Sequence, residues 1–117
     1  MNDHERLVDD FRRALQQRDA DRIAGLLHPD VRLTLYSAAE PISGREAAHE
    51  WYREAFGRRI VFEGTATVAE ADTDAVVLRG RIYWYEPHEG GRDQPGEWVM
   101  MFRDGLIASI EARTPGS

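Results

Sequence analysis

Three stretches decide the fold: VVLRGRIYWY at residues 76–85, EWVMMFR at residues 97–103 and IASIEAR at residues 107–113. Apolar side chains alternate with mostly polar ones in each stretch. Successive side chains of a strand point to opposite faces of a sheet, so the alternation predicts antiparallel strands with one apolar and one polar face. The apolar face carries Trp84 and Trp98 and no ionisable group. A pocket built on this face would be hydrophobic and would lack a strand-borne acid or base.

Neighbouring segments extend this predicted sheet. Residues 60–68 alternate in the same way and predict another strand. Asp104 and Gly105 form a strong tight-turn signal between the last two strands. Residues 87–96 are rich in proline and glycine, which predicts a flexible hairpin loop.

Helical periodicity dominates the first part of the chain. Residues 3–17 carry apolar side chains at spacings of three and four, which predicts a helix capped by Asp3. Asp19 or Asp21 begins a short second helix. That helix is expected to end at the residue before Pro29, because such a residue is pushed out of helical geometry.

A strand and a third helix complete the predicted elements. Residues 31–36 form a short strand. Ser43 and Glu46 have the spacing of a capping box, which begins a helix that ends at Gly57. The order helix, helix, strand, helix and four antiparallel strands belongs to the α+β class, with helices gathered on one face of a sheet. No linker or repeat divides the chain, so we expect one domain over residues 1–117.

Composition limits the partners and cofactors. The net charge is −6 and every basic residue is arginine, so the surface repels phosphate backbones and nucleic acid is not an expected partner. There is no cysteine, and no two histidines have the spacing of a zinc-binding helix, so we expect no metal and no cofactor. No apolar run approaches the roughly 20 residues of a membrane span, and residues 1–5 lack signal-peptide character. These features predict a cytoplasmic protein with no membrane partner.

Four motifs resemble the nuclear transport factor 2-like superfamily, also called the SnoaL-like or ketosteroid-isomerase-like fold. They are RDAD at residues 18–21, LHPDV at 27–31, ISGRE at 42–46 and FRDGLI at 102–107. The resemblance implies three N-terminal helices packed on a strongly curved antiparallel sheet, which together form a cone-shaped pocket in a cystatin-like α+β barrel. It also implies a homodimer through the opposite sheet face. Family members include isomerases, epoxide hydrolases, dehydratases, polyketide cyclases and noncatalytic binding proteins, so the fold does not choose the activity.

The resemblance allows a comparison with the steroid isomerases, which need a carboxylate base and two oxyanion donors, a tyrosine and a neutral acid. Aligned through the ISGRE motif, the base position falls at Leu35, the tyrosine donor at Phe11 and the acid donor at Trp98. All three are apolar here. Tyr52 matches a tyrosine that supports the donors, but it cannot replace the missing proton acceptor. Steroid isomerase chemistry is therefore disfavoured.

Other chemistries of the family lack their residues as well. Epoxide hydrolases use an aspartate-arginine-aspartate set, whereas Arg79 and Arg81 are predicted on the polar sheet face. Polyketide cyclases would need a carboxylate and a histidine at inward strand positions, which are apolar or glycine here. The catalytic residues are unknown, and the candidates are Tyr52 as a donor with His49 or Glu40 as a base. Tyr36 and Glu40 are also placed to cover the pocket mouth.

Two residue sets follow from the predicted sheet faces. The pocket is expected to be lined by apolar and aromatic side chains: Phe11, Leu35, Trp51, Tyr52, Phe62, Leu78, Trp84, Trp98, Met100, Phe102 and Ile110. The polar face mixes arginines with apolar groups, which suits a self-complementary two-fold interface. The expected dimer residues are Arg79, Arg81, Tyr83, Val99, Met101 and Arg103.

Three function classes remain open from the sequence. The first is a domain whose hydrophobic pocket binds a small apolar or aromatic carbonyl-type molecule. The second is a SnoaL-like enzyme of the isomerase, cyclase or dehydratase type with non-standard catalytic residues. The third is a protein-interaction module, which a filled interior would favour.

Overall fold

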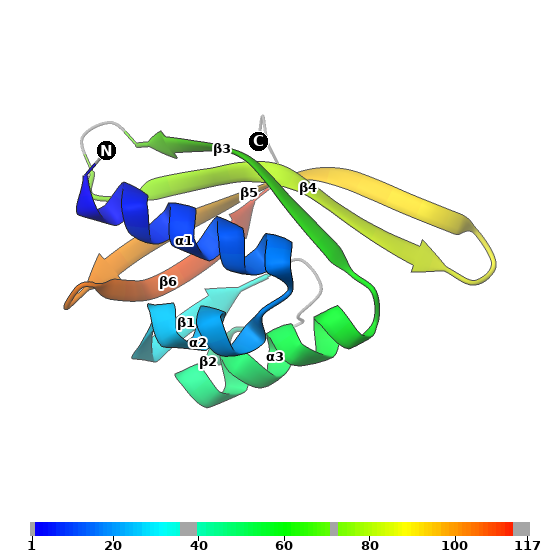
Figure 1. Ribbon diagram of the computed structural model, residues 1–117, viewed down its shortest axis with the longest axis horizontal. Coiled ribbons are helices and arrows are strands. Elements are labelled where there is room, and N and C mark those ends of the chain that lie inside the picture. Colours follow the sequence, from blue (N-terminus) through cyan, green and yellow to red (C-terminus); the bar gives the residue numbers. More distant parts are fainter. Residues whose placement is uncertain (1, 36–39, 71–72, 114–117) are drawn as a thin grey trace.

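Three helices pack on a six-stranded mixed sheet in the computed structural model, which describes residues 2–35, 40–70 and 73–113 (Figure 1). The α+β class predicted from the sequence is confirmed. The helices and strands, in chain order, are α1 (Asp3–Gln17), α2 (Ala20–Leu26), β1 (Leu27–Thr34), β2 (Ile42–Ser43), α3 (Arg45–Gly57), β3 (Val61–Ala69), β4 (Val76–Glu86), β5 (Gly90–Arg103) and β6 (Leu106–Arg113).

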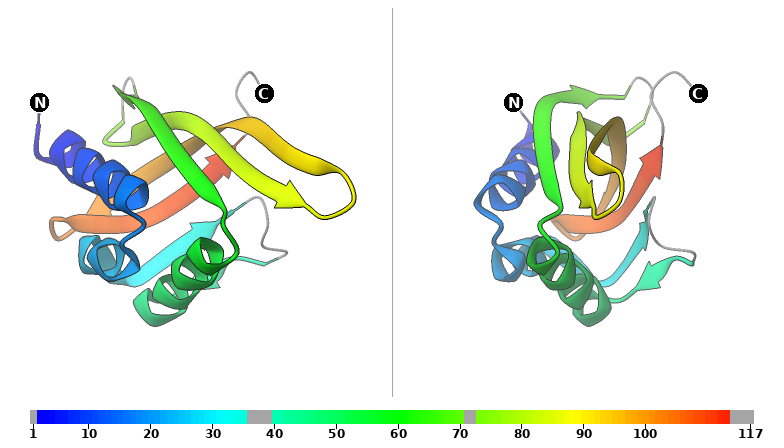
Figure 2. Two further views of the ribbon diagram at one scale, coloured as in Figure 1. Left: turned by 45° about the vertical axis from the view of Figure 1, so that its right-hand side comes forward. Right: turned by 90° about the vertical axis from the view of Figure 1, so that its right-hand side faces the viewer.

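The sheet order is β2-β1-β6-β5-β4-β3. Neighbouring strands of this sheet pair in antiparallel orientation, with one exception. Strands β1 and β6 run parallel, with Leu33 opposite Ile110. The expectation of a purely antiparallel sheet was therefore wrong at this pair. Alternation along a strand sets which face each side chain occupies, but it carries no information about strand direction. With β2 and β3 at its two edges, the sheet curves strongly without closing into a barrel, and the helices gather on one side (Figure 2).

A row of three glycines crosses the curved part of the sheet. Gly64 on β3 lies opposite Gly80 on β4, which lies opposite Gly96 on β5. The β3–β4 register shifts just after Gly64, which is the mark of a bulge. At Gly80 a Cβ atom would lie 1.9 Å from the Glu63 carbonyl oxygen, so the two backbones approach more closely than any side chain allows. Glycine and a bulge at one level explain where the sheet bends.

The starts of α1 and α3 differ from the predicted caps. Asn2 caps α1, because its side chain accepts a hydrogen bond of 2.8 Å from the Glu5 amide, and Asp3 is already helical. The capping box predicted at α3 does not form: Ser43 pairs with Arg32 as part of β2, and the N-cap is Gly44, without a side-chain cap. The φ of Gly44 is 96°, a conformation that favours glycine.

The second helix is shorter than predicted. Asp19 caps α2 by accepting a bond of 3.0 Å from the Arg22 amide, but the helix ends at Leu26 and β1 begins at once with Leu27. Residues 27–30 therefore belong to strand β1, although the sequence analysis expected the strand to begin only at Val31. The carbonyl of Leu27 accepts two bonds from the Arg45 guanidinium, at 2.9 and 2.6 Å. This contact joins the end of α2 to the start of α3.

The β4–β5 hairpin projects well beyond the helices (Figures 1 and 2). Its strands pair continuously from Val76 with Met100 to Glu86 with Gly90, and the turn spans residues 87–89. The flexible loop expected over residues 87–96 was wrong, because most of this stretch belongs to β5. Long cross-strand pairing outweighs the low strand propensity of its glycines and proline.

The side-chain faces follow the predicted alternation. Leu78, Trp98, Met100 and Ile110 lie on the side of the helices, and Leu78, Met100 and Ile110 join the buried core with α1. No helix within the described ranges is long and apolar enough to cross a membrane. A cytoplasmic location stays a prediction.

Candidate functional site

A cavity of about 290 Å³ lies where α3 faces the curved part of the sheet. Six of the residues predicted for the pocket border it: Leu35, Trp51, Tyr52, Phe62, Trp84 and Trp98. The lining is completed by Ile60, Ile82 and Gln94. It is predominantly apolar and aromatic, which is typical of small-molecule sites.

Three elements supply most of this lining. Helix α3 contributes the neighbouring rings of Trp51 and Tyr52. Strand β4 contributes Ile82 and Trp84, which are two positions apart and therefore share a face. Strand β5 contributes Trp98 and, closer to the hairpin turn, Gln94. The sheet curvature is what brings the hairpin residues and the helix residues around one volume.

Phe62 is the centre of an aromatic cluster at the cavity wall. Its ring centroid lies 6.1 Å from that of Trp51, 6.2 Å from that of Tyr52 and 6.4 Å from that of Trp98. Edge-to-face and tilted contacts of this kind are favourable beyond simple area burial. Phe62 also borders a second hollow of about 380 Å³ between α1 and β3, which contains the side chains of Arg12 and Arg18. The Phe62 ring therefore borders both hollows.

Tyr52 brings a hydroxyl group to the cavity lining. The residue is 2% exposed, and its hydroxyl has no hydrogen-bond partner among the described residues. No described side-chain oxygen or nitrogen is both sealed from solvent and unpartnered, so this hydroxyl must border open volume. Burial raises the pKa of the Tyr52 hydroxyl well above its ordinary value. The group is therefore a neutral phenol that can donate a hydrogen bond into the cavity.

Gln94 supplies a second polar group that the sequence analysis missed. It lies on β5 opposite Ile82, half-buried, and its amide makes no hydrogen bond to another described residue. Because residues 87–96 were predicted to be a loop, no face was assigned to Gln94. The signal was present: Gln94, Gly96 and Trp98 continue the even-numbered series of the inward face.

The other predicted pocket residues lie elsewhere. Phe11, Leu78, Met100 and Ile110 are fully enclosed in the core and do not border the cavity. Phe102 stacks on the ring of His4, with 4.2 Å between centroids, near the start of α1. Helix α1 fills this end of the sheet, so the apolar face is divided between core and cavity.

The predicted proton-transfer residues do not meet in the cavity. His49 faces the surface, where its Nε2 lies 2.7 Å from Asp21 Oδ1, and Glu40 is exposed. Tyr36 lies outside the described residues. The described cavity lining contains no carboxylate and no imidazole. Within residues 2–35, 40–70 and 73–113, no group of three or more histidine or acidic side chains is placed to hold a metal ion.

The three residues aligned with the catalytic positions of the steroid isomerases do not all line the cavity. Leu35 and Trp98 border the cavity, while Phe11 is buried against the edge of the Tyr52 ring, with centroids 6.0 Å apart. Their apolar side chains cannot accept a proton.

The opposite face of the sheet is organised around Glu97. Its carboxylate accepts bonds from Arg79 at 2.8 Å and Arg113 at 3.1 Å, and it is 7% exposed. The hydrogen bond from Arg79, supported by Arg113, holds the pKa of the Glu97 carboxyl below its ordinary value. Arg81 makes a separate pair with Asp93 at 2.8 Å. The predicted dimer residues Arg79, Met101 and Arg103 are exposed, while Arg81, Tyr83 and Val99 are half-buried in the isolated chain.

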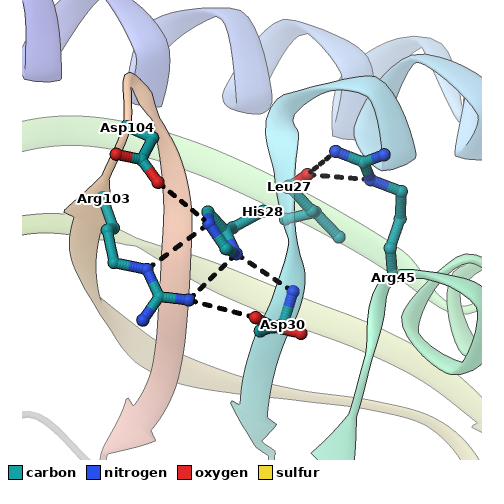
Figure 3. A network of polar contacts seen from close by, with 6 residues as sticks. All are labelled: Leu27, His28, Asp30, Arg45, Arg103 and Asp104. Atoms are coloured by element: carbon teal, nitrogen blue, oxygen red, sulfur yellow. Dashed lines mark hydrogen bonds and ion pairs between the residues drawn. The ribbon is translucent and has the colours of Figure 1, made fainter.

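Arg103 also takes part in a polar network around His28, a buried residue on β1 (Figure 3). The Asp30 amide donates to His28 Nδ1 at 3.0 Å, and His28 Nε2 lies 3.3 Å from Asp104 Oδ2. The Arg103 guanidinium lies beside the ring and donates to Asp30 Oδ2 at 3.3 Å. These contacts join β1 to the β5–β6 turn and lie outside the cavity lining.

Comparison with known proteins gives the family. The model of the SnoaL-like domain family matches residues 8–110. A search of curated proteins finds no significant match. Three solved structures illustrate the shared fold. One is an NTF2-like protein of unknown function from Burkholderia pseudomallei, with 16% identity, a TM-score of 0.80, and coverage of 97% of this chain and 92% of that one.

The other two structures are described as enzymes or candidates. SalBIII, an epoxide hydrolase/cyclase-like enzyme of salinomycin pyran ring formation, has 16% identity, a TM-score of 0.78, and coverage of 92% of this chain and 86% of its own. A candidate polyketide cyclase from Sinorhizobium meliloti has 18% identity, a TM-score of 0.73, and coverage of 97% of this chain and 100% of its own. At these identities the structures support the fold alone. Because the family model spans most of the chain, the protein belongs to the SnoaL-like domain family.

Proposed function

We propose that this domain binds a small, uncharged, apolar or aromatic molecule that carries a carbonyl-type acceptor. The observation that carries the proposal is the Tyr52 hydroxyl, a neutral donor in the lining of an aromatic cavity that has no hydrogen-bond partner among the described residues. An acceptor atom on a bound ligand would give this hydroxyl a hydrogen-bond partner inside the cavity.

Hydrophobic contact supplies the driving force. A ligand that buries about 200 Å² of apolar surface gains roughly 5 kcal/mol at about 25 cal/mol per Å². The loss of translational and rotational freedom on association is of similar size. We therefore expect modest affinity, with polar contacts deciding which aromatic molecules bind.

Binding without chemistry agrees better with the lining than catalysis does. General base catalysis needs a proton acceptor within hydrogen-bond reach of the substrate. The described lining offers none, since His49 is paired with Asp21 and Glu40 is exposed. An isomerase, cyclase or dehydratase activity is the alternative, and turnover that falls in His49→Ala or Glu40→Gln variants would favour it.

We also propose that the polar sheet face forms a homodimer. Met101 is 43% exposed on this face, beside half-buried Val99, and both apolar groups lie near the charges around Glu97. A two-fold contact would cover them and let arginines and carboxylates of the two copies face one another. Light scattering coupled to size-exclusion chromatography tests this proposal, and a single 13.4 kDa species at high concentration would refute it.

A matched pair of variants on the hairpin tests the binding site. Trp84 borders the cavity, whereas its neighbour Tyr85 points to the opposite face and is 67% exposed. A panel of uncharged aromatic compounds is screened by thermal shift on the wild-type protein. For each stabilising compound, Trp84→Ala should abolish most of the shift and Tyr85→Ala should preserve it. Equal shifts in all three proteins would reject the cavity as the binding site.

A further inference from the structure

Two residues with polar side chains line the same cavity from different elements: Tyr52 on α3 and Gln94 on β5, and neither the hydroxyl nor the amide has a hydrogen-bond partner among the described residues. We infer that the cavity selects a neutral, planar ligand with polar groups at both ends, a carbonyl held by Tyr52 and a hydroxyl or second carbonyl held by Gln94. This inference rests on the proposed function and specifies the ligand class.

The inner end of the site is defined by Tyr52. Its ring packs against the buried Phe11 in a T-shaped contact, and the residue is 2% exposed. Because burial keeps the phenol protonated, it offers a donor to a carbonyl oxygen. A carboxylate would accept this bond as well, but its charge would be buried without a cation, since the described lining contains no arginine.

The outer end is defined by Gln94. This residue lies toward the turn of the projecting hairpin and is half-buried, whereas Tyr52 is almost fully enclosed. The neighbouring Asp93 is held by Arg81 at 2.8 Å, so the nearest carboxylate on this strand is already paired. An amide both donates and accepts, and it therefore suits a hydroxyl or a carbonyl.

The middle of the site determines the shape of the ligand. Trp51, Phe62 and Trp98 present rings with centroids about 6 Å apart along one wall, and Ile82 and Trp84 approach from β4. Rigid rings on several sides favour a flat aromatic body over a flexible chain, because little side-chain freedom is lost on contact. A flat body also places its two polar groups in a fixed relation.

Four bicyclic compounds of similar shape test the inference by isothermal titration calorimetry. Umbelliferone has a carbonyl at one end and a hydroxyl at the other, coumarin has the carbonyl end, naphthol has the hydroxyl and naphthalene has neither. Mildly acidic buffer keeps the umbelliferone hydroxyl neutral. Each hydrogen bond should improve the dissociation constant by about 3- to 10-fold, the range for one net neutral bond. Umbelliferone should bind tightest and naphthalene weakest, while naphthoate, which is charged, should not bind measurably.

Two conservative variants assign each end. Tyr52→Phe should remove the advantage of coumarin over naphthalene and leave the advantage of naphthol over naphthalene unchanged. Gln94→Leu should do the reverse. These comparisons within one variant cancel any general change in stability or cavity volume.

The outcomes separate the inference from the proposed function. If the four neutral compounds bind equally and neither variant changes their order, the two-ended recognition is wrong and the apolar binding site stands. If none of them binds at its solubility limit, both the inference and the proposed function are overturned. Tight binding of naphthoate would also overturn the inference, because it would require a cation in the cavity.

Discussion

Replacing Gly80 with alanine tests whether the close approach of β3 and β4 produces the curvature of the sheet. A Cβ atom at this position would lie 1.9 Å from the Glu63 carbonyl oxygen, 2.9 Å from its carbonyl carbon and 3.0 Å from the Gly64 Cα. All three neighbours are backbone atoms, so no side-chain rotation relieves the overlap. An ordinary contact needs about 3.4 Å between such atoms, and the strands would have to separate by more than 1 Å.

The expected cost of Gly80→Ala exceeds that of ordinary overpacking. Extra methylene groups in a packed interior cost about 1–3 kcal/mol, and a clash with rigid backbone lies at the upper end or beyond. We expect a loss of at least about 3 kcal/mol in the free energy of unfolding, measured by urea denaturation. The loss of strand contact should also flatten the sheet and enlarge or open the cavity.

Gly91→Ala is the matched control. Gly91 lies in the same hairpin, and a Cβ atom there meets no atom within 4 Å. Alanine restricts the unfolded chain more than glycine does, so this variant should be neutral or slightly more stable. If Gly80→Ala unfolds within 1 kcal/mol of Gly91→Ala, the glycine row does not determine the sheet geometry, and the account of the curvature is refuted.

Two further predictions concern single side chains. Phe62→Ala should lower the free energy of unfolding by about 3–5 kcal/mol in urea denaturation, because it removes the ring that packs near Trp51 and Tyr52 and lines two hollows. A loss below about 1 kcal/mol would contradict this packing. Glu97→Gln should cost about 1–2 kcal/mol at neutral pH, reduced by the partial exposure of both arginines. Because the folded pKa of Glu97 is below its unfolded value of about 4.3, its contribution is present above that value and is lost as the pH falls through the folded pKa. The wild-type protein should therefore lose more stability than Glu97→Gln on acidification, and parallel pH profiles would show that the carboxylate contributes nothing.

Local pattern was sufficient for much of the fold. The 3.6-residue period of α1 and the two-residue period of β3 to β6 identify these elements because each period reflects backbone geometry. The same period placed Trp84 and Trp98 on the inward face, where both border the cavity. The absence of a strand-borne base on that face was also readable from the sequence alone.

Local pattern failed where long-range contacts decide the structure. Ser43 has the sequence of a helix cap, yet pairing with Arg32 makes it part of a strand. Gln94 lies among glycines and prolines that suggest a loop, yet pairing with Ile82 makes it part of the hairpin and of the cavity wall. In both cases a partner distant in sequence supplied hydrogen bonds that the local preference did not anticipate.

The amino-acid sequence by itself determined the secondary-structure periods, the two faces of the sheet and the apolar character of the inward one. Only the tertiary structure decided how that inward face is divided. Leu78 and Met100 are fully enclosed in the core, whereas Trp84 and Trp98 border the cavity. All four have the same alternation in the sequence, and what distinguishes them is which helix lies over them and how far the sheet bends at Gly80. Burial against an element distant in the sequence depends on the path of the whole chain, and the alternation of side chains along one strand contains no information about that path.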